Sequence, residues 1–138
     1  MSTSSEWAAL FSATRLATAS LSSGEIPRSP GVYAWFQDGE CVYVGKARNL
    51  RARLGTHLSS SLDLSRSTLR ASVAVKALGV TRKYARRRPT VMTPEQIAIV
   101  SEWFATAEIS WLECKSREEA HSLERRLLES RMPALNLI

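Results

Sequence analysis

The chain has 138 residues, of which 44% are hydrophobic and 23% are charged, and this balance is typical of a single folded domain. Its net charge is +6, and its two cysteines, Cys41 and Cys114, are too few and too far apart for a zinc site or a disulfide framework. We expect a protein of the cytoplasm that does not enter a membrane.

The first 25 residues, 1–25, are expected to form a helical extension of this domain. Trp7, Leu10 and Phe11 follow helical spacing and predict an amphipathic helix over about 5–20. The first charged residue is acidic, and a later arginine interrupts the apolar residues. The segment is therefore a poor signal peptide and too polar to span a membrane, and we expect it to pack against the domain.

Two short strands are predicted next, with the sequences GVYAWF and ECVYVG, joined by a turn at Asp38-Gly39. A two-residue turn would place Tyr33 and Tyr43 on opposite faces of the hairpin. A three-residue loop that ends at Gly39 would place the two tyrosines directly across from each other on one face. The sequence leaves both registers open, and a tyrosine in a strand is ordinarily a core residue whose hydroxyl reaches water.

A helix is predicted over about 50–60, with Asn49 as its cap. Its leucines share one face, and Arg53 and His57, four residues apart, border that apolar seam. Singly, each has an ordinary explanation, because an arginine stem can pack on a core and a buried histidine can be satisfied by hydrogen bonds. Together they suggest polar groups that converge on one place.

A basic segment precedes the C-terminal part of the chain. Between residues 64 and 94 there are eight positive charges and no acidic residue, so the rest of the chain carries a net charge of −2. We expect a helix over about 67–78, an irregular stretch over 81–92 and a helix that begins at Thr93-Pro94. This charge favours nucleic acid as a partner, although a basic loop on an ordinary protein would look similar. The candidate nucleic-acid-binding residues are Arg66, Arg70, Lys76, Arg82, Lys83, Arg86, Arg87 and Arg88.

The last two elements contain the most informative anomaly. A strand over 108–115 precedes a helix that begins after the capping box of Ser116 and Glu119. Glu124 lies near the middle of the apolar stripe of this helix, where an unpaired carboxylate is costly. It is therefore either protonated or has a cation beside it, which would be a neighbouring arginine in an ion pair or a metal ion at the floor of a cleft. We predict that residues 1–138 form one α/β (α+β) domain, a three-stranded antiparallel sheet flanked by helices.

The tripeptides GVY at 31–33 and YVG at 43–45 resemble the two motifs of the GIY-YIG nuclease superfamily, with valine in place of each middle isoleucine. Lys46 follows the second motif, and Arg53 lies ten residues after the tyrosine of that motif. His57 stands where the family carries a tyrosine or a histidine. In this core the chain closely resembles the N-terminal nuclease module of bacterial excision-repair incision subunits.

The C-terminal segment resembles the end of the same family. A metal-binding glutamate there precedes an asparagine by twelve residues, as Glu124 precedes Asn136 in this chain. The resemblance covers about 31–58 and 108–136. Residues 59–107 lie outside it, and we interpret them as a basic helical insertion that recognises the substrate.

The resemblance implies an endonuclease that hydrolyses phosphodiester bonds in DNA, or alternatively in RNA, with one divalent cation, Mg²⁺ or Mn²⁺. Glu124 would hold this ion, and Arg53 would bind the scissile phosphate and the charge that develops on it. Asn136 would orient Glu124 or a backbone group.

The resemblance also implies roles for the remaining site residues. Tyr33 would be the general base, and Tyr43 would position the attacking water or share that role. A free tyrosine has a pKa of about 10, so Tyr33 needs cations nearby, and Lys46, Arg53 and the metal ion are the candidates. His57 would accept or relay the proton from Tyr33.

Two other classes of protein remain as alternatives. A nucleic-acid-binding module on the same fold would share the basic segment without cleaving its ligand. A structural or interaction protein would hold Glu124 in an ion pair and leave the arginines solvated. Strandedness and sequence specificity stay open, and high specificity would require either a homodimer or the insertion.

Overall fold

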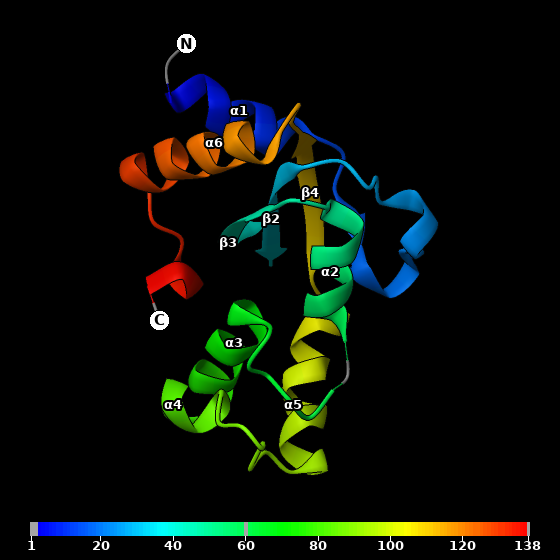
Figure 1. Ribbon diagram of the computed structural model, residues 1–138, viewed down its shortest axis with the longest axis vertical. Coiled ribbons are helices and arrows are strands. Elements are labelled where there is room, and N and C mark those ends of the chain that lie inside the picture. The colour runs from blue at the N-terminus through cyan, green and yellow to red at the C-terminus, as the bar shows by residue number, and fades with distance from the viewer. Residues whose placement is uncertain (1–2, 60, 138) are drawn as a thin grey trace.

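A four-stranded antiparallel sheet lies at the centre of the protein, in a computed structural model that describes residues 3–59 and 61–137 (Figure 1). The strands follow the order β1-β4-β2-β3, with β1 at Leu16–Ala17, β2 at Gly31–Gln37, β3 at Glu40–Ala47 and β4 at Glu108–Glu113. The predicted α/β class with an antiparallel sheet is confirmed, but the prediction of three strands is wrong. The additional strand, β1, has only two residues, which is too short to show an alternating pattern in the sequence.

The N-terminal extension contains less helix than predicted. Helix α1 spans Thr3–Ser12 rather than about 5–20, and two short 3₁₀ turns follow β1 at Thr18–Ser20 and Ser23–Glu25. The helix ends early because the backbone that follows it pairs with β4. The N–H of Thr18 also donates to the carbonyl of Ala107, the residue that precedes β4 (3.1 Å). This pairing joins segments far apart in the chain, so local propensity does not reveal it.

The register of the β2–β3 hairpin combines features of both registers left open by the sequence. Asp38 and Gly39 form a two-residue turn, with φ angles of 52° and 79°. Phe36 pairs with Cys41, but Trp35 pairs with Tyr43, so one residue of β3 bulges out of the ladder. The bulge moves Tyr43 onto the face that carries Trp35 and therefore also onto the face of Tyr33.

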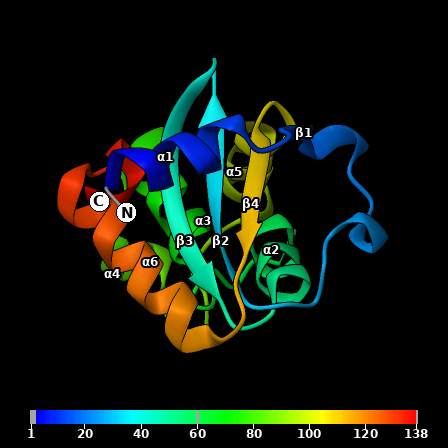
Figure 2. The ribbon, with the colours of Figure 1, turned by 90° about the horizontal axis from the view of Figure 1, so that it is seen from above.

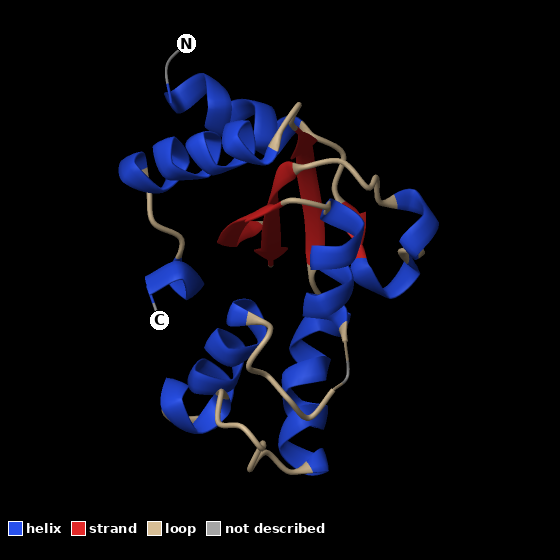
Figure 3. Cartoon of the chain, in the orientation of Figure 1, coloured by secondary structure: helices blue, strands red, loops and turns tan. Residues whose placement is uncertain are grey.

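The sheet separates two hydrophobic layers, each covered by helices (Figures 2 and 3). On one face, Val32, Ala34 and Phe36 pack with α1 and with α6, which spans Arg117–Ser130. The other face carries Tyr33, Trp35 and Tyr43. It is covered by α2 at Leu50–Leu58, α3 at Thr68–Leu78 and α5 at Pro94–Ala105. The insertion thus lies over the tyrosine face of the sheet.

Local signals in the sequence place most helix ends correctly. Asn49 caps α2 by accepting a hydrogen bond from the N–H of Ala52 (3.1 Å), and Thr93 and Gln96 form a capping box on α5. Gly79 ends α3 with a φ of 71°. Within the stretch expected to be irregular, the structure forms a short helix, α4, at Arg82–Ala85.

The N-terminal extension packs on the opposite side of the sheet from the insertion. Trp7 is 5% exposed, and its indole N–H donates to the hydroxyl of Ser130 on α6 (2.8 Å). In the described part of the chain, no helix has the length and apolar content needed to cross a membrane.

Candidate active site

The two motif tyrosines lie side by side on the insertion-covered face of the sheet. Their ring centroids are 6.5 Å apart, and Tyr33 and Tyr43 are 1% and 8% exposed. Gly45 pairs directly with Tyr33 across the hairpin, and a Cβ atom at Gly45 would collide with the Tyr33 hydroxyl. The glycine of the second motif is therefore required by the close approach of the phenol.

His57 is fully buried behind Tyr33. Its Nε2 lies 2.6 Å from the Tyr33 hydroxyl, and its Nδ1 lies 2.7 Å from Oγ of Ser67, a residue of the insertion. Burial lowers the pKa of His57 to about 3, and the positive charges of Arg53 and Arg70 act in the same direction. The imidazole is therefore neutral near pH 7, with one nitrogen facing the phenol.

Arg53 lies beside the tyrosines and is held by the insertion. Its Nη1 donates to the carbonyl of Arg66 (3.0 Å), and its Nη2 donates to the hydroxyl of Thr68 (3.5 Å). The same hydroxyl lies 2.7 Å from the hydroxyl of Tyr43. Sequence reasoning missed Ser67 and Thr68, since hydroxyl residues at the start of a helix are expected as caps and carry no further signal.

Burial and neighbouring charges set the acidity of both phenols. Burial raises the pKa of Tyr33 and of Tyr43, and the charge of Arg53 lowers both. A hydrogen bond with Thr68 also lowers the pKa of Tyr43. Of the two basic side chains expected to act on Tyr33, Arg53 lowers its pKa, whereas the ammonium of Lys46 donates to Nδ1 of His121 (2.5 Å).

Glu124 is half-buried on α6 and lies within electrostatic reach of the other groups. Burial raises the pKa of its carboxyl, and the charges of Lys46, His121 and Arg53 lower it. Glu124 in turn raises the pKa of Tyr33. Within residues 3–59 and 61–137 its carboxylate forms no salt bridge, so the ion pair with a neighbouring arginine does not occur.

Asn136 anchors the backbone of β3 rather than the Glu124 side chain. Its Oδ1 accepts from the N–H of Val44 and its Nδ2 donates to the carbonyl of Val44, both at 2.9 Å. β3 is an edge strand, so these two groups would otherwise lack a partner in the sheet. The asparagine therefore fixes the strand between the tyrosine and the glycine of the second motif.

A hollow of about 480 Å³ opens beside Arg53. Its lining is mainly cationic, which suits the approach of an anion. It is lined by Lys46, Ala47, Arg48, Arg53, Arg117, Glu118 and His121. His121 has no signature in the sequence, because an exposed polar side chain on a helix is unremarkable.

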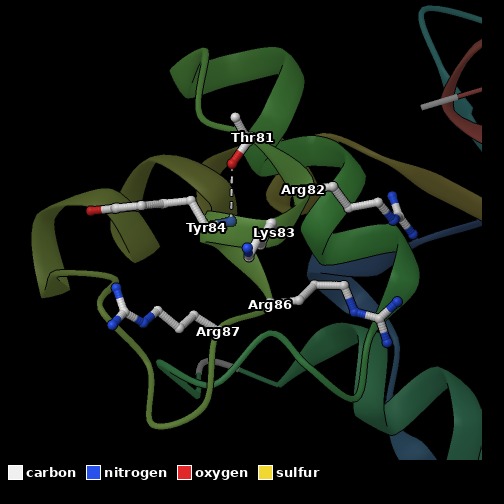
Figure 4. Close-up of a pocket in the computed structure, with 6 residues that line it drawn as sticks. All are labelled: Thr81, Arg82, Lys83, Tyr84, Arg86 and Arg87. Carbon is white, nitrogen blue, oxygen red and sulfur yellow. Dashed lines mark hydrogen bonds between the residues drawn. The ribbon is translucent and has the colours of Figure 1, made fainter.

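A larger hollow, of about 930 Å³, lies at α4 (Figure 4). Arg82 and Arg86 extend to one side of it, and Tyr84 and Arg87 extend to the other. The charge of Arg82 lowers the pKa of Tyr43, so this basic surface lies within electrostatic reach of the tyrosine pair. Its lining residues are Thr81, Arg82, Lys83, Tyr84, Arg86 and Arg87.

The expectation that Arg70 contacts nucleic acid is wrong. The residue is 2% exposed, its guanidinium donates to the hydroxyl of Ser101 (3.2 Å), and it lies over the ring of Phe104 (5.2 Å). Burial lowers its pKa to about 10. Arg70 therefore belongs to the interior of the insertion, whereas Arg66, Lys76 and Arg88 are exposed as expected.

The donor set fits a weakly held, hydrated ion. No cluster of three or more histidine, cysteine or acidic side chains forms a metal cage in the described residues. A single half-buried carboxylate without a salt bridge, at Glu124, leaves most coordination positions to water and to substrate oxygens. Mg²⁺ favours such an arrangement, because it retains several waters.

Sequence comparison supplies the class and the family of this domain. Residues 25–138 match the model of the GIY-YIG catalytic domain. The chain belongs to this family of nucleases, as its two motifs predicted.

Several relatives are UvrABC system protein C from bacteria. The protein from Acidothermus cellulolyticus is 29% identical over 116 residues, which are 83% of this chain and 13% of that protein. The protein from Salinispora arenicola is 51% identical over 47 residues, which are 33% of this chain and 7% of that protein. The chain thus spans only a small part of the length of these relatives.

A similar solved structure is the GIY-YIG N-terminal endonuclease domain of UvrC from Thermotoga maritima, bound to magnesium. The two are 23% identical, with a TM-score of 0.46, over 80% of this chain and 86% of the other.

Proposed function

We propose that this chain is a divalent-metal-dependent endonuclease that hydrolyses phosphodiester bonds in DNA. The observation that carries the proposal is the meeting of Glu124 and Arg53 at the tyrosine pair, where the charge of Arg53 lowers and that of Glu124 raises the pKa of both phenols. An acid that only stabilised the fold would be expected to pair with a base, yet Glu124 forms no salt bridge in the described chain.

Glu124 is the residue that would hold one divalent cation, Mg²⁺ or Mn²⁺. When bound, such an ion supplies positive charge to the phosphate and lowers the pKa of a coordinated water. The half-buried position of Glu124 leaves its charge less screened than on an open surface. Asn136 supports this region by fixing β3.

Arg53 would bind the scissile phosphate. Its guanidinium borders the cationic hollow and is already oriented by the carbonyl of Arg66. An oriented guanidinium can stabilise the charge that develops on a phosphate without reorganising during the reaction. Lys46 and Arg48 in the same hollow would bind neighbouring phosphates.

Tyr33 and His57 would remove the proton from the attacking water. Because burial raises the pKa of Tyr33, a free phenolate is disfavoured, and the phenol needs an acceptor for its own proton. Neutral His57 provides one at 2.6 Å, in the tautomer with its proton on Nδ1. Tyr33 would take a proton from water as its own proton passes to Nε2 of His57, which would relay it from Nδ1 toward Ser67 because burial disfavours a charged imidazole. Tyr43 would orient the water.

The basic surface at α4 would hold the nucleic acid near this centre. Arg82, Lys83, Arg86 and Arg87 line one hollow, and phosphate contacts by such side chains release counterions. Arg66, Lys76 and Arg88 would add charge around it.

The decisive experiment compares Glu124→Gln with Glu129→Gln. Glu129 lies on the same helix, but its exposed carboxylate pairs with Arg125 (3.7 Å), so its loss is a matched control. Each protein is incubated with single-stranded, duplex and branched DNA, with Mg²⁺ or with EDTA. We expect Glu124→Gln to bind DNA without cutting it, and Glu129→Gln to cut at the parental rate.

Parental cleavage by Glu124→Gln would remove Glu124 from the mechanism. A parent chain that binds every substrate and cuts none would support the non-cleaving binding module instead.

A further inference from the structure

Three consecutive residues of the insertion contact three groups of the proposed catalytic centre. The carbonyl of Arg66 accepts from Arg53, and Oγ of Ser67 lies 2.7 Å from His57. The hydroxyl of Thr68 contacts both Tyr43 and Arg53. The catalytic face of the sheet is therefore completed by a segment of the insertion, which lies within the residues matched by the family model.

Thr68 differs from its neighbour because its hydroxyl does not cap the helix. Ser67 is the N-cap of α3 and accepts from the N–H of Arg70 (3.0 Å). Thr68 is the first residue within α3, and its hydroxyl contacts only the phenol of Tyr43 and the guanidinium of Arg53 among the hydrogen bonds of the described chain. Removing this hydroxyl should leave the helix start intact.

The chemistry of the two partners orients the Thr68 hydroxyl. A guanidinium only donates, so the Thr68 oxygen accepts from Arg53 and can direct its own proton to the oxygen of Tyr43. This arrangement leaves the phenolic proton of Tyr43 free to face a water or a phosphate. It also ties the phenol and the guanidinium to one atom, so that neither moves independently of the other.

The segment that carries Thr68 is itself held in place from the basic surface. Arg86 donates to the carbonyl of Ser65 (2.7 Å), and Arg53 donates to the next carbonyl, that of Arg66 (3.0 Å). One arginine of the proposed DNA-binding surface and one of the catalytic centre thus bind adjacent peptide groups. Such support is what a precisely oriented site requires.

We propose that Thr68 is a positioning residue of this nuclease, whose hydroxyl fixes the phenol of Tyr43 and the guanidinium of Arg53 in the arrangement that hydrolysis requires. The proposal rests on the proposed function. It assigns to the insertion a role in the reaction itself, in addition to binding the substrate.

The test compares Thr68→Val, Thr68→Ser and the control Thr56→Val. Valine keeps the shape of threonine without its hydroxyl, and serine keeps the hydroxyl. Thr56 is a helical threonine whose hydroxyl, among residues 3–59 and 61–137, donates only to the carbonyl of Ala52 (3.1 Å). We expect Thr68→Val to lower kcat about 10- to 100-fold, with KM and DNA affinity in EDTA unchanged within about twofold. Thr68→Ser should recover most of this loss, and Thr56→Val should match the parent.

A second measurement does not depend on cleavage. The chain has 3 tyrosines, so protein labelled with ¹³C at the tyrosine Cζ atom should give 3 resonances, of which Tyr43→Phe identifies one. Thr68→Val should move the Tyr43 resonance and leave that of Tyr84 in place. Thr56→Val should move neither.

The outcomes separate the two proposals. If the parent cleaves DNA and Thr68→Val has the same kcat or the same Tyr43 resonance as the parent, the positioning role alone is overturned. A folded parent that binds DNA without cutting any substrate overturns the proposed function, and the positioning role with it.

Discussion

Replacing His57 with glutamine should flatten the dependence of stability on pH. Burial lowers the folded-state pKa of His57 to about 3, whereas an unfolded histidine has a pKa of about 6.5. Because the folded-state pKa is the lower one, this contribution to stability is fully present above the unfolded pKa. This stability is lost as pH falls toward the folded pKa, because His57 then binds a proton in the unfolded chain but not in the native protein.

The expected magnitude follows from the unfolded state. Between pH 7 and pH 5 the native imidazole stays neutral while the unfolded imidazole becomes almost fully charged. This difference lowers the free energy of unfolding by about 2 kcal/mol, and any folded-state pKa below about 4 gives the same result. The His57→Gln variant lacks this proton uptake, so its loss of stability between pH 7 and pH 5 should be smaller by that amount.

The assay is urea denaturation of each protein at pH 7, 6 and 5. The variant loses hydrogen bonds to Tyr33 and Ser67, so its absolute stability should fall, and only the change with pH is diagnostic. His121→Gln is the control, because it removes the only other histidine from an exposed position and keeps the buried imidazole. A His57→Gln variant with the same pH dependence as the parent would refute the burial of a neutral imidazole.

Three further predictions concern the edge strand, the basic surface and the metal. Asn136→Ala removes two hydrogen bonds to β3 and should cost about 1–3 kcal/mol in urea denaturation, and a loss below 0.5 kcal/mol would contradict its anchoring role. Replacing Arg86, Arg87 and Arg88 with glutamine should weaken duplex binding and reduce its salt slope by about 0.9 for each phosphate that is no longer neutralised, whereas an unchanged slope would place DNA elsewhere. Mg²⁺ at ten times its dissociation constant should stabilise the parent by about 1.4 kcal/mol in thermal unfolding, and an equal gain in Glu124→Gln would contradict metal binding there.

Local chemistry determined most of the elements. The capping box at Thr93, the cap at Asn49 and the glycine at 79 each act within one helical turn, so the sequence alone predicts where these helices begin or end. The motif spacing likewise identified the family, and the apolar stripe of α6 drew attention to Glu124.

Contacts between distant segments decided the rest. The bulge that brings Tyr43 to the face of Tyr33 depends on pairing across the whole hairpin, and β1 exists only because β4 offers it an edge. Arg70 looked like any other basic residue in its segment, yet packing against Phe104 buries it. The residue type gives a side chain's charge, but its exposure to solvent depends on which elements of the fold cover it.

The same division holds within the candidate site. The sequence alone supplied the tyrosines, Arg53, His57 and Glu124, because each breaks a local pattern or fills a motif position. Only the tertiary structure revealed Thr68, because its hydroxyl reaches Tyr43 and Arg53 only when α3 packs against the sheet. A hydrogen bond between residues 43 and 68 depends on the relative placement of two elements, and no local preference of either one encodes that placement.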